Sequence, residues 1–136
     1  MLATARHFLI TDQAKALLEA NDCEFVESPY GGDANDAQMD RAEMAERLKD
    51  VHGVISAGTI DQTVLDAAPH LQVISRRGVG YDRIDVDAAT KRGIPVTTTP
   101  GAMDDAVADH AFALLLAVAR RIPQLHEQVV SGTWQT

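Results

Sequence analysis

Arginine and glycine residues that could bind an anion lie close together near the middle of this 136-residue chain. Arg76, Arg77 and Arg83 surround the glycine pair Gly78 and Gly80. Glycine has no Cβ atom, so the backbone amides beside it can approach an anion closely, and a guanidinium group can bind a carboxylate or a phosphate. The pattern predicts a site for a small anion. A tight turn between a strand and a helix, with solvated arginines, is the alternative that composition leaves open.

The distribution of charge favours the same part of the chain. Residues 1–50 hold 11 acidic and 5 basic side chains, for a net charge of −6, whereas residues 51–136 hold 9 and 7, for a net charge of −2. An anion site is therefore expected after residue 50. The overall charge of −8 repels phosphate backbones, so we predict that nucleic acid is not a partner.

Other chemistries have little support in the sequence. The stretch from Gly78 to Arg83 begins like a dinucleotide-binding loop, but Arg83 occupies the position of the third glycine, so we predict no cofactor loop. The five histidines lack metal-ligand spacing, and Cys23 is the single cysteine, so neither a metal site nor an internal disulfide is predicted. His110, beside Asp109, could be a general base, although a helix histidine at an interface is the favoured interpretation.

The elements that must position the anion site follow from the pattern of apolar residues. Strand-like and helix-like segments alternate, with strands expected at residues 6–10, 23–27, 53–56, 71–75 and 94–98, and helices at 13–20, 35–49, 63–68 and 86–92. Thr11 with Asp12 is expected to cap the first of these helices, and Asp85 the last. This alternation predicts an α/β fold with a doubly wound, five-stranded parallel sheet, and Pro95 favours an edge position for the last strand. Ligands of such sheets bind beyond the carboxyl ends of the strands, which selects the loops at 56–59, 76–81 and 98–103.

The last part of the sequence predicts a long helix, from about residue 106 to residue 121. Its middle, residues 111–119, contains no polar side chain, so the helix must be covered on every side. One face can pack on its own domain, and the remainder needs another domain or another subunit. We therefore predict a homodimer, or a swapped arrangement, through this helix.

Length and composition indicate an ordinary globular domain. Hydrophobic residues make up 46% of the chain and charged residues 24%, close to the globular average. No apolar stretch approaches the roughly 18 residues of a membrane span, and the first residues do not resemble a signal peptide. These features predict a soluble, cytoplasmic protein with no membrane partner.

Several linked motifs resemble the D-isomer-specific 2-hydroxyacid dehydrogenases, especially the phosphoglycerate-dehydrogenase-like members. They lie, in order, at residues 73–85, 92–96, 99–101, 108–110 and 113–123. The resemblance implies a flavodoxin-like substrate-binding domain, expected at residues 1–103. Residues 104–136 would then form the interdomain helix and the start of the linker to an NAD-binding domain.

The resemblance also implies which residues bind the substrate. The backbone of two loops would hold the carboxylate of a small 2-hydroxyacid or 2-oxoacid, and Arg76 would lie near a second anionic group of a phosphorylated substrate. The residues implied are Ser56, Ala57, Gly58, Thr59, Arg76, Gly78, Val79 and Gly80. The family's NAD loop and catalytic side chains belong to the nucleotide-binding domain, so this chain is expected to be a fragment without catalytic residues, inactive alone and unable to bind NAD.

Two interpretations of function remain from different classes. In the first, the chain is the substrate half of an NAD-dependent enzyme that interconverts a D-2-hydroxyacid and a 2-oxoacid. In the second, it is a stand-alone flavodoxin-like module that binds a small anion or has a regulatory role. The second lacks two signatures: a phosphate-binding loop in place of Thr11, Asp12 and Gln13, and a receiver-type aspartate in place of Ser56.

Overall fold

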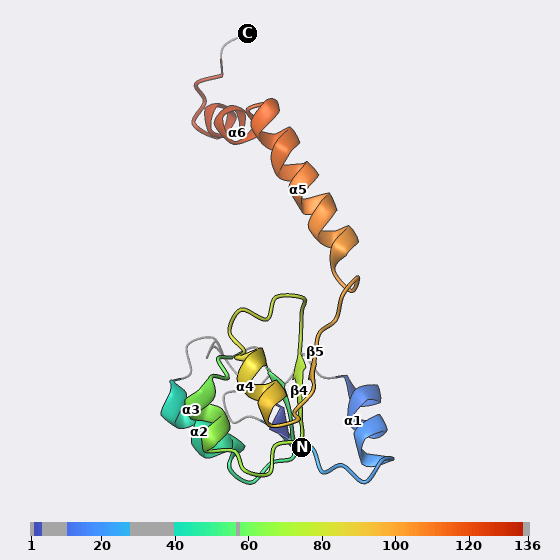
Figure 1. The fold of residues 1–136 in the computed structure, drawn as a ribbon. Coiled ribbons are helices and arrows are strands. Elements are labelled where there is room, and N and C mark those ends of the chain that lie inside the picture. The colour runs from blue at the N-terminus through green and yellow to red at the C-terminus, as the bar shows by residue number, and fades with distance from the viewer. Residues whose placement is uncertain (1, 4–10, 28–39, 57, 135–136) are drawn as a thin grey trace. The chain divides into compact units, whose positions relative to one another are not determined.

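The computed structural model describes residues 2–3, 11–27, 40–56 and 58–134. Two compact units divide the chain, Met1–Thr99 and Pro100–Thr136. The first contains all the strands and four of the helices found in the described residues, and the second contains two helices (Figure 1).

A parallel sheet forms the centre of the first unit. Its strands are β1 (Leu2–Ala3), β2 (Val26–Glu27), β3 (Gly53–Ser56), β4 (Val73–Arg76) and β5 (Val96–Thr97). They are ordered β2-β1-β3-β4-β5, and every neighbouring pair is parallel. The predicted α/β class with a parallel sheet is confirmed.

Some strand boundaries differ from those that the sequence predicted. The strand expected at residues 6–10 lies outside the described residues, and β1 is found earlier, at Leu2–Ala3. At the other edge, β5 begins at Val96 rather than at residue 94. Pro95 has no amide to donate to the ladder, although its carbonyl accepts a bond from the Ile74 amide at 3.0 Å. The edge position predicted for this strand is confirmed.

Each helix of the first unit begins at a side chain that caps it. The helices are α1 (Asp12–Glu19), α2 (Arg41–Leu48), α3 (Gln62–Asp66) and α4 (Val86–Lys91). Their caps are Thr11, Asp40, Asp61 and Asp85, and each accepts a hydrogen bond from a backbone amide of the first turn. Such caps satisfy amides that have no partner within the helix. The predicted caps Thr11 and Asp85 are therefore confirmed.

The core lies between the central strands and the helices α2, α3 and α4. Val54 of β3 and Ile74 of β4 are buried against side chains of these helices. The buried hydrophobic residues are Met44, Leu48, Val54, Ile60, Val64, Leu65, Ala68, Leu71, Ile74, Ile84, Ala88, Ala89 and Ile94. Helix α1 contributes none of them. The buried core of this unit thus supports the strands that lead into the loops after β3 and β4.

The second unit consists of α5 (Asp104–Ala119) and α6 (Ile122–Val130). The helix expected at residues 106–121 is found two residues earlier, because Asp104 and Asp105 form its first turn and Arg121 has a left-handed backbone with φ of +53°. No residue of either helix is buried. Within the described part of the chain, none of the helices has the length and apolar character needed to cross a membrane.

Candidate functional site

The ends of β3 and β4 bring two of the predicted loops side by side. Ser56 and Arg76, the last residues of these strands, are paired in the parallel register. Beyond the strands, the Ile60 amide donates to the Arg83 carbonyl at 2.8 Å, and the Asp85 amide donates to the Ile60 carbonyl at 2.9 Å. The loops after β3 and β4 are therefore joined at their start and again near their end.

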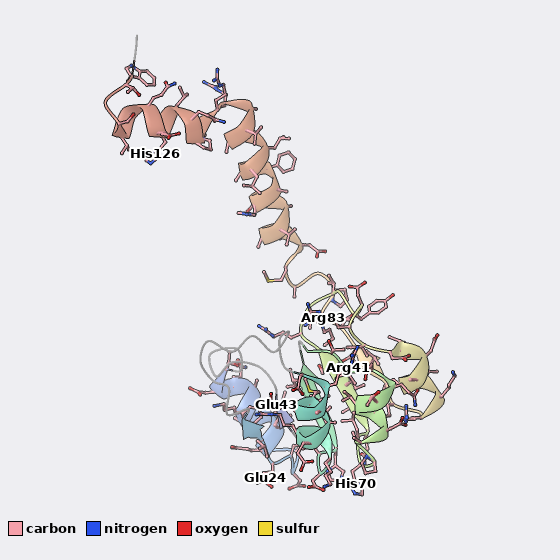
Figure 2. All side chains as sticks on the ribbon, turned by 90° about the vertical axis from the view of Figure 1, so that its left-hand side faces the viewer. Glu24, Arg41, Glu43, His70, Arg83 and His126 are labelled. Carbon is pink, nitrogen blue, oxygen red and sulfur yellow. The ribbon has the colours of Figure 1, made fainter. Side chains whose placement is uncertain are left out.

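The loop after β5 joins the same site through Thr99. The Thr99 amide donates to the Gly78 carbonyl at 3.1 Å, and the Gly78 amide donates to Thr99 Oγ1 at 3.0 Å. All three loops selected from the sequence thus meet at the carboxyl edge of the sheet. Figure 2 shows Arg83 at this end of the first unit, whereas Glu24 and His70 lie at the opposite end.

Arg76 braces the loop formed by Gly78, Val79 and Gly80, which we call the Gly-Val-Gly loop. Its Nε donates to the Gly80 carbonyl at 2.9 Å, and its Nη1 donates to the Arg77 carbonyl at 2.7 Å. Arg76 is half-buried, whereas Arg77 and Arg83 are exposed. The position of Arg76 at the end of the strand predicts a contact with an anion, and it is the only signal in the sequence for these bonds within the loop. Its contact with an anion stays a prediction.

Backbone amides of the Gly-Val-Gly loop differ in their partners. Gly78 has a φ of +123°, a conformation that favours glycine, and its amide is bonded to Thr99. The amides of Val79 and Gly80 have no hydrogen-bond partner among the described residues, and both residues are exposed. Two open amides in succession beside a guanidinium group can donate hydrogen bonds to a carboxylate. Of the three amides predicted to bind an anion, these two are thus open and that of Gly78 is occupied.

The predicted residues after β3 are only partly described. Ser56 ends the strand, Ala57 lies outside the described residues, Gly58 is buried and Thr59 is half-buried. Their contact with an anion stays a prediction. The neighbouring Ile60 pairs with Ile84, so this segment is joined to the end of the loop that follows β4.

The other candidate groups lie apart from these loops. His110 is exposed on α5 in the second unit, and its interface role stays a prediction. Cys23, a free thiol, is half-buried near the start of β2. Among the residues that the structure describes, no three His, Cys, Asp or Glu side chains are grouped so that they could hold a metal ion.

Comparison with known proteins identifies the family. The sequence model of one protein family, the D-isomer specific 2-hydroxyacid dehydrogenase catalytic domain, matches residues 8–133. A glyoxylate reductase of Thermococcus litoralis is 48% identical over 97 residues, which cover 70% of this chain and 29% of the relative. A D-3-phosphoglycerate dehydrogenase of Archaeoglobus fulgidus is 41% identical over 99 residues, 71% of this chain and 19% of the relative.

A solved structure supports the same assignment. The TT0316 protein from Thermus thermophilus has a TM-score of 0.77 and 33% identity, and the match covers 99% of this chain and 42% of that one. The chain spans less than a third of the length of the curated glyoxylate reductases that it matches. It belongs to the D-isomer specific 2-hydroxyacid dehydrogenases, as a portion of their catalytic, substrate-binding domain.

Proposed function

We propose that this chain is the substrate-binding half of an NAD(P)-dependent D-2-hydroxyacid dehydrogenase that acts on a small 2-oxoacid such as glyoxylate. The observation that carries the proposal is the pair of open amides, Val79 and Gly80, at the carboxyl edge of the sheet. The names of the most similar curated relatives favour glyoxylate as the substrate. A phosphorylated hydroxyacid is the second candidate, favoured by the phosphoglycerate dehydrogenase relative.

In this proposal the chain's own residues bind and orient the substrate. The amides of Val79 and Gly80 donate to its carboxylate, the backbone of Gly58 and Thr59 borders it, and Arg76 contributes positive charge. Backbone donors suit this task because they are fixed before the substrate arrives and need no side-chain ordering. The residues that move the proton and the hydride belong to the nucleotide-binding domain of the family.

The domain division is part of the same proposal. Residues 1–103 form the substrate-binding domain, and residues 104–136 form the interdomain helix and the start of the linker. The strand order β2-β1-β3-β4-β5 supports a flavodoxin-like arrangement of the first part. In that arrangement ligands bind at the carboxyl edge, where the three loops meet.

Members of the family use NAD(P), and that cofactor would supply or accept the hydride. The residues described here do not fit a dinucleotide: Arg83 follows Gly78 and Gly80 where the binding loop needs a third glycine. We therefore assign NAD(P) to the nucleotide-binding domain. Calorimetric titration of the 136-residue chain with NAD should give no saturable heat, and the chain alone should not reduce glyoxylate. Micromolar binding of NAD would contradict the assignment.

A titration with oxalate, a stable analogue of a small 2-oxoacid, tests the carboxylate site. In nuclear magnetic resonance spectra of the ¹⁵N-labelled chain, the amide signals of Val79 and Gly80 should shift most, with a dissociation constant in the millimolar range. Weak binding is expected because the family's remaining substrate contacts come from the second domain on closure. Micromolar binding would favour the stand-alone anion-binding module, and signals that do not move would exclude the carboxylate site.

A further inference from the structure

Thr99 and Arg76 together determine how the peptide groups of the Gly-Val-Gly loop are oriented. In the peptide between Arg77 and Gly78, the carbonyl accepts from Arg76 and the amide donates to Thr99 Oγ1. In the next peptide, the Gly78 carbonyl accepts from the Thr99 amide. The Gly80 carbonyl accepts from Arg76. Three peptide groups of the loop are therefore held by two residues.

These bonds also decide which amides stay open. In a planar trans peptide the C=O and N–H bonds point to opposite sides. Because the Gly78 carbonyl faces the Thr99 amide, the Val79 amide in the same peptide must face away from Thr99. The contact between Gly78 and Thr99, which lies 21 residues further along the chain, thus directs the Val79 amide away from Thr99.

Gly78 needs this restraint more than other residues would. Its φ of +123° lies in a region that only glycine adopts readily. Because glycine populates positive and negative φ about equally, its own preference does not hold the loop in this conformation. A loop that fluctuates would lose conformational freedom each time it bound an anion, and this entropy cost weakens binding. The Thr99 hydroxyl lowers that cost by holding the Gly78 amide.

We propose that Thr99 is a positioning residue of the carboxylate site, acting through Gly78 rather than by touching the substrate. This inference rests on the proposed function, because it assumes that the amides of Val79 and Gly80 donate hydrogen bonds to a substrate carboxylate. Of the two bonds between Thr99 and Gly78, only the one to Thr99 Oγ1 depends on the side chain. The other is made by the backbone amide of residue 99, which every substitution except proline retains.

Two substitutions and a control isolate the hydroxyl. Thr99→Val keeps the shape of the side chain but removes the hydroxyl oxygen that accepts from the Gly78 amide. Thr99→Ser retains that hydroxyl. Thr97→Val makes the same change two residues earlier, at an exposed position on β5 whose hydroxyl has no partner among the described residues. Because Thr99 is itself exposed, the valine variant should unfold at nearly the same temperature as the original chain.

The variants are compared in the oxalate titration and by amide hydrogen exchange. Thr99→Val should exchange the Gly78 amide proton faster and bind oxalate about threefold to tenfold more weakly, as expected for one lost hydrogen bond. Thr99→Ser and Thr97→Val should behave as the original chain. Restoration by serine separates this role from a general loss of stability.

The possible failures are distinguishable. If the original chain shifts its Val79 and Gly80 signals with oxalate and Thr99→Val shifts them at the same concentrations, the role of Thr99 is wrong while the carboxylate site stands. The same conclusion follows if serine does not restore binding. If the original chain shows no response to oxalate, the carboxylate site is wrong and the role of Thr99 falls with it.

Discussion

At the scale of single residues, Arg76 combines charge with a structural task. Its guanidinium group holds the carbonyls of Gly80 and Arg77, so removing it changes the loop as well as the local potential. In a two-domain enzyme that carries this segment, Arg76→Ala should raise KM for an anionic substrate more than it lowers kcat, because the lost interactions serve binding throughout the reaction.

Arg77→Ala is the matched control for this prediction. Arg77 is exposed, and the bond from Arg76 reaches its backbone carbonyl, which alanine retains. Steady-state kinetics of both variants check the prediction. Equal effects on KM would mean that only net charge near the loop matters, and unchanged kinetics in Arg76→Ala would refute its role.

Gly78 is the position in the loop least able to accept a side chain. A Cβ atom there would sit 4.0 Å from the guanidinium group of Arg76, and the φ of +123° strains any L-residue regardless of space. Gly78→Val should therefore lower stability by about 1–3 kcal/mol and abolish the oxalate response. Gly93, with a φ of +71° and open space around its Cβ position, provides the control. Gly93→Ala should lower stability in chemical denaturation while leaving oxalate binding unchanged.

At the scale of elements, the loops depend on the helices packed against β3 and β4. Leu48 of α2 is 0% exposed, whereas Leu17 of α1 is 66% exposed. Leu48→Ala should cost about 2–5 kcal/mol of unfolding free energy through lost burial and a residual cavity. Leu17→Ala should cost less than about 0.5 kcal/mol. Urea denaturation followed by circular dichroism measures both, and equal losses would contradict the packing of α2 in this core.

At the scale of the whole molecule, the second unit carries large apolar side chains that no residue of its own two helices buries. In α5, Phe112, Leu115 and Val118 are 66%, 62% and 77% exposed. Burying each such side chain is worth about 1.5–3 kcal/mol. The homodimer predicted from the sequence would bury them, with α5 and the tail through Trp134 packing against a second copy.

Light scattering at tens of micromolar tests the dimer. The original chain should have twice the monomer mass, and the double variant Leu115→Glu with Leu116→Glu should have the monomer mass, because buried carboxylates are costly. Leu17→Glu introduces the same side chain at an exposed position of α1 and should leave the mass unchanged. A monomeric original chain would refute the dimer.

Local patterns in the sequence determined much of this protein. The spacing of apolar residues indicated the α/β class, Thr11 and Asp85 indicated helix starts, and Pro95 indicated an edge strand. These features depend on interactions within a few residues of the chain, which is why single-sequence reasoning reaches them. The linked motifs from residue 73 onward likewise indicated the family that the comparison shows.

Only the tertiary structure decided how the site is held together. The bonds between Thr99 and Gly78, and between Ile60 and the segment from Arg83 to Asp85, join loops that are remote in sequence. They exist because β3, β4 and β5 are neighbours in a definite register, and no local pattern encodes which loop polar groups then meet. For the same reason, the sequence identified glycines suited to an anion, whereas the fold determined that the Gly78 amide is bonded to Thr99 and that those of Val79 and Gly80 have no partner in the part of the chain that the structure describes.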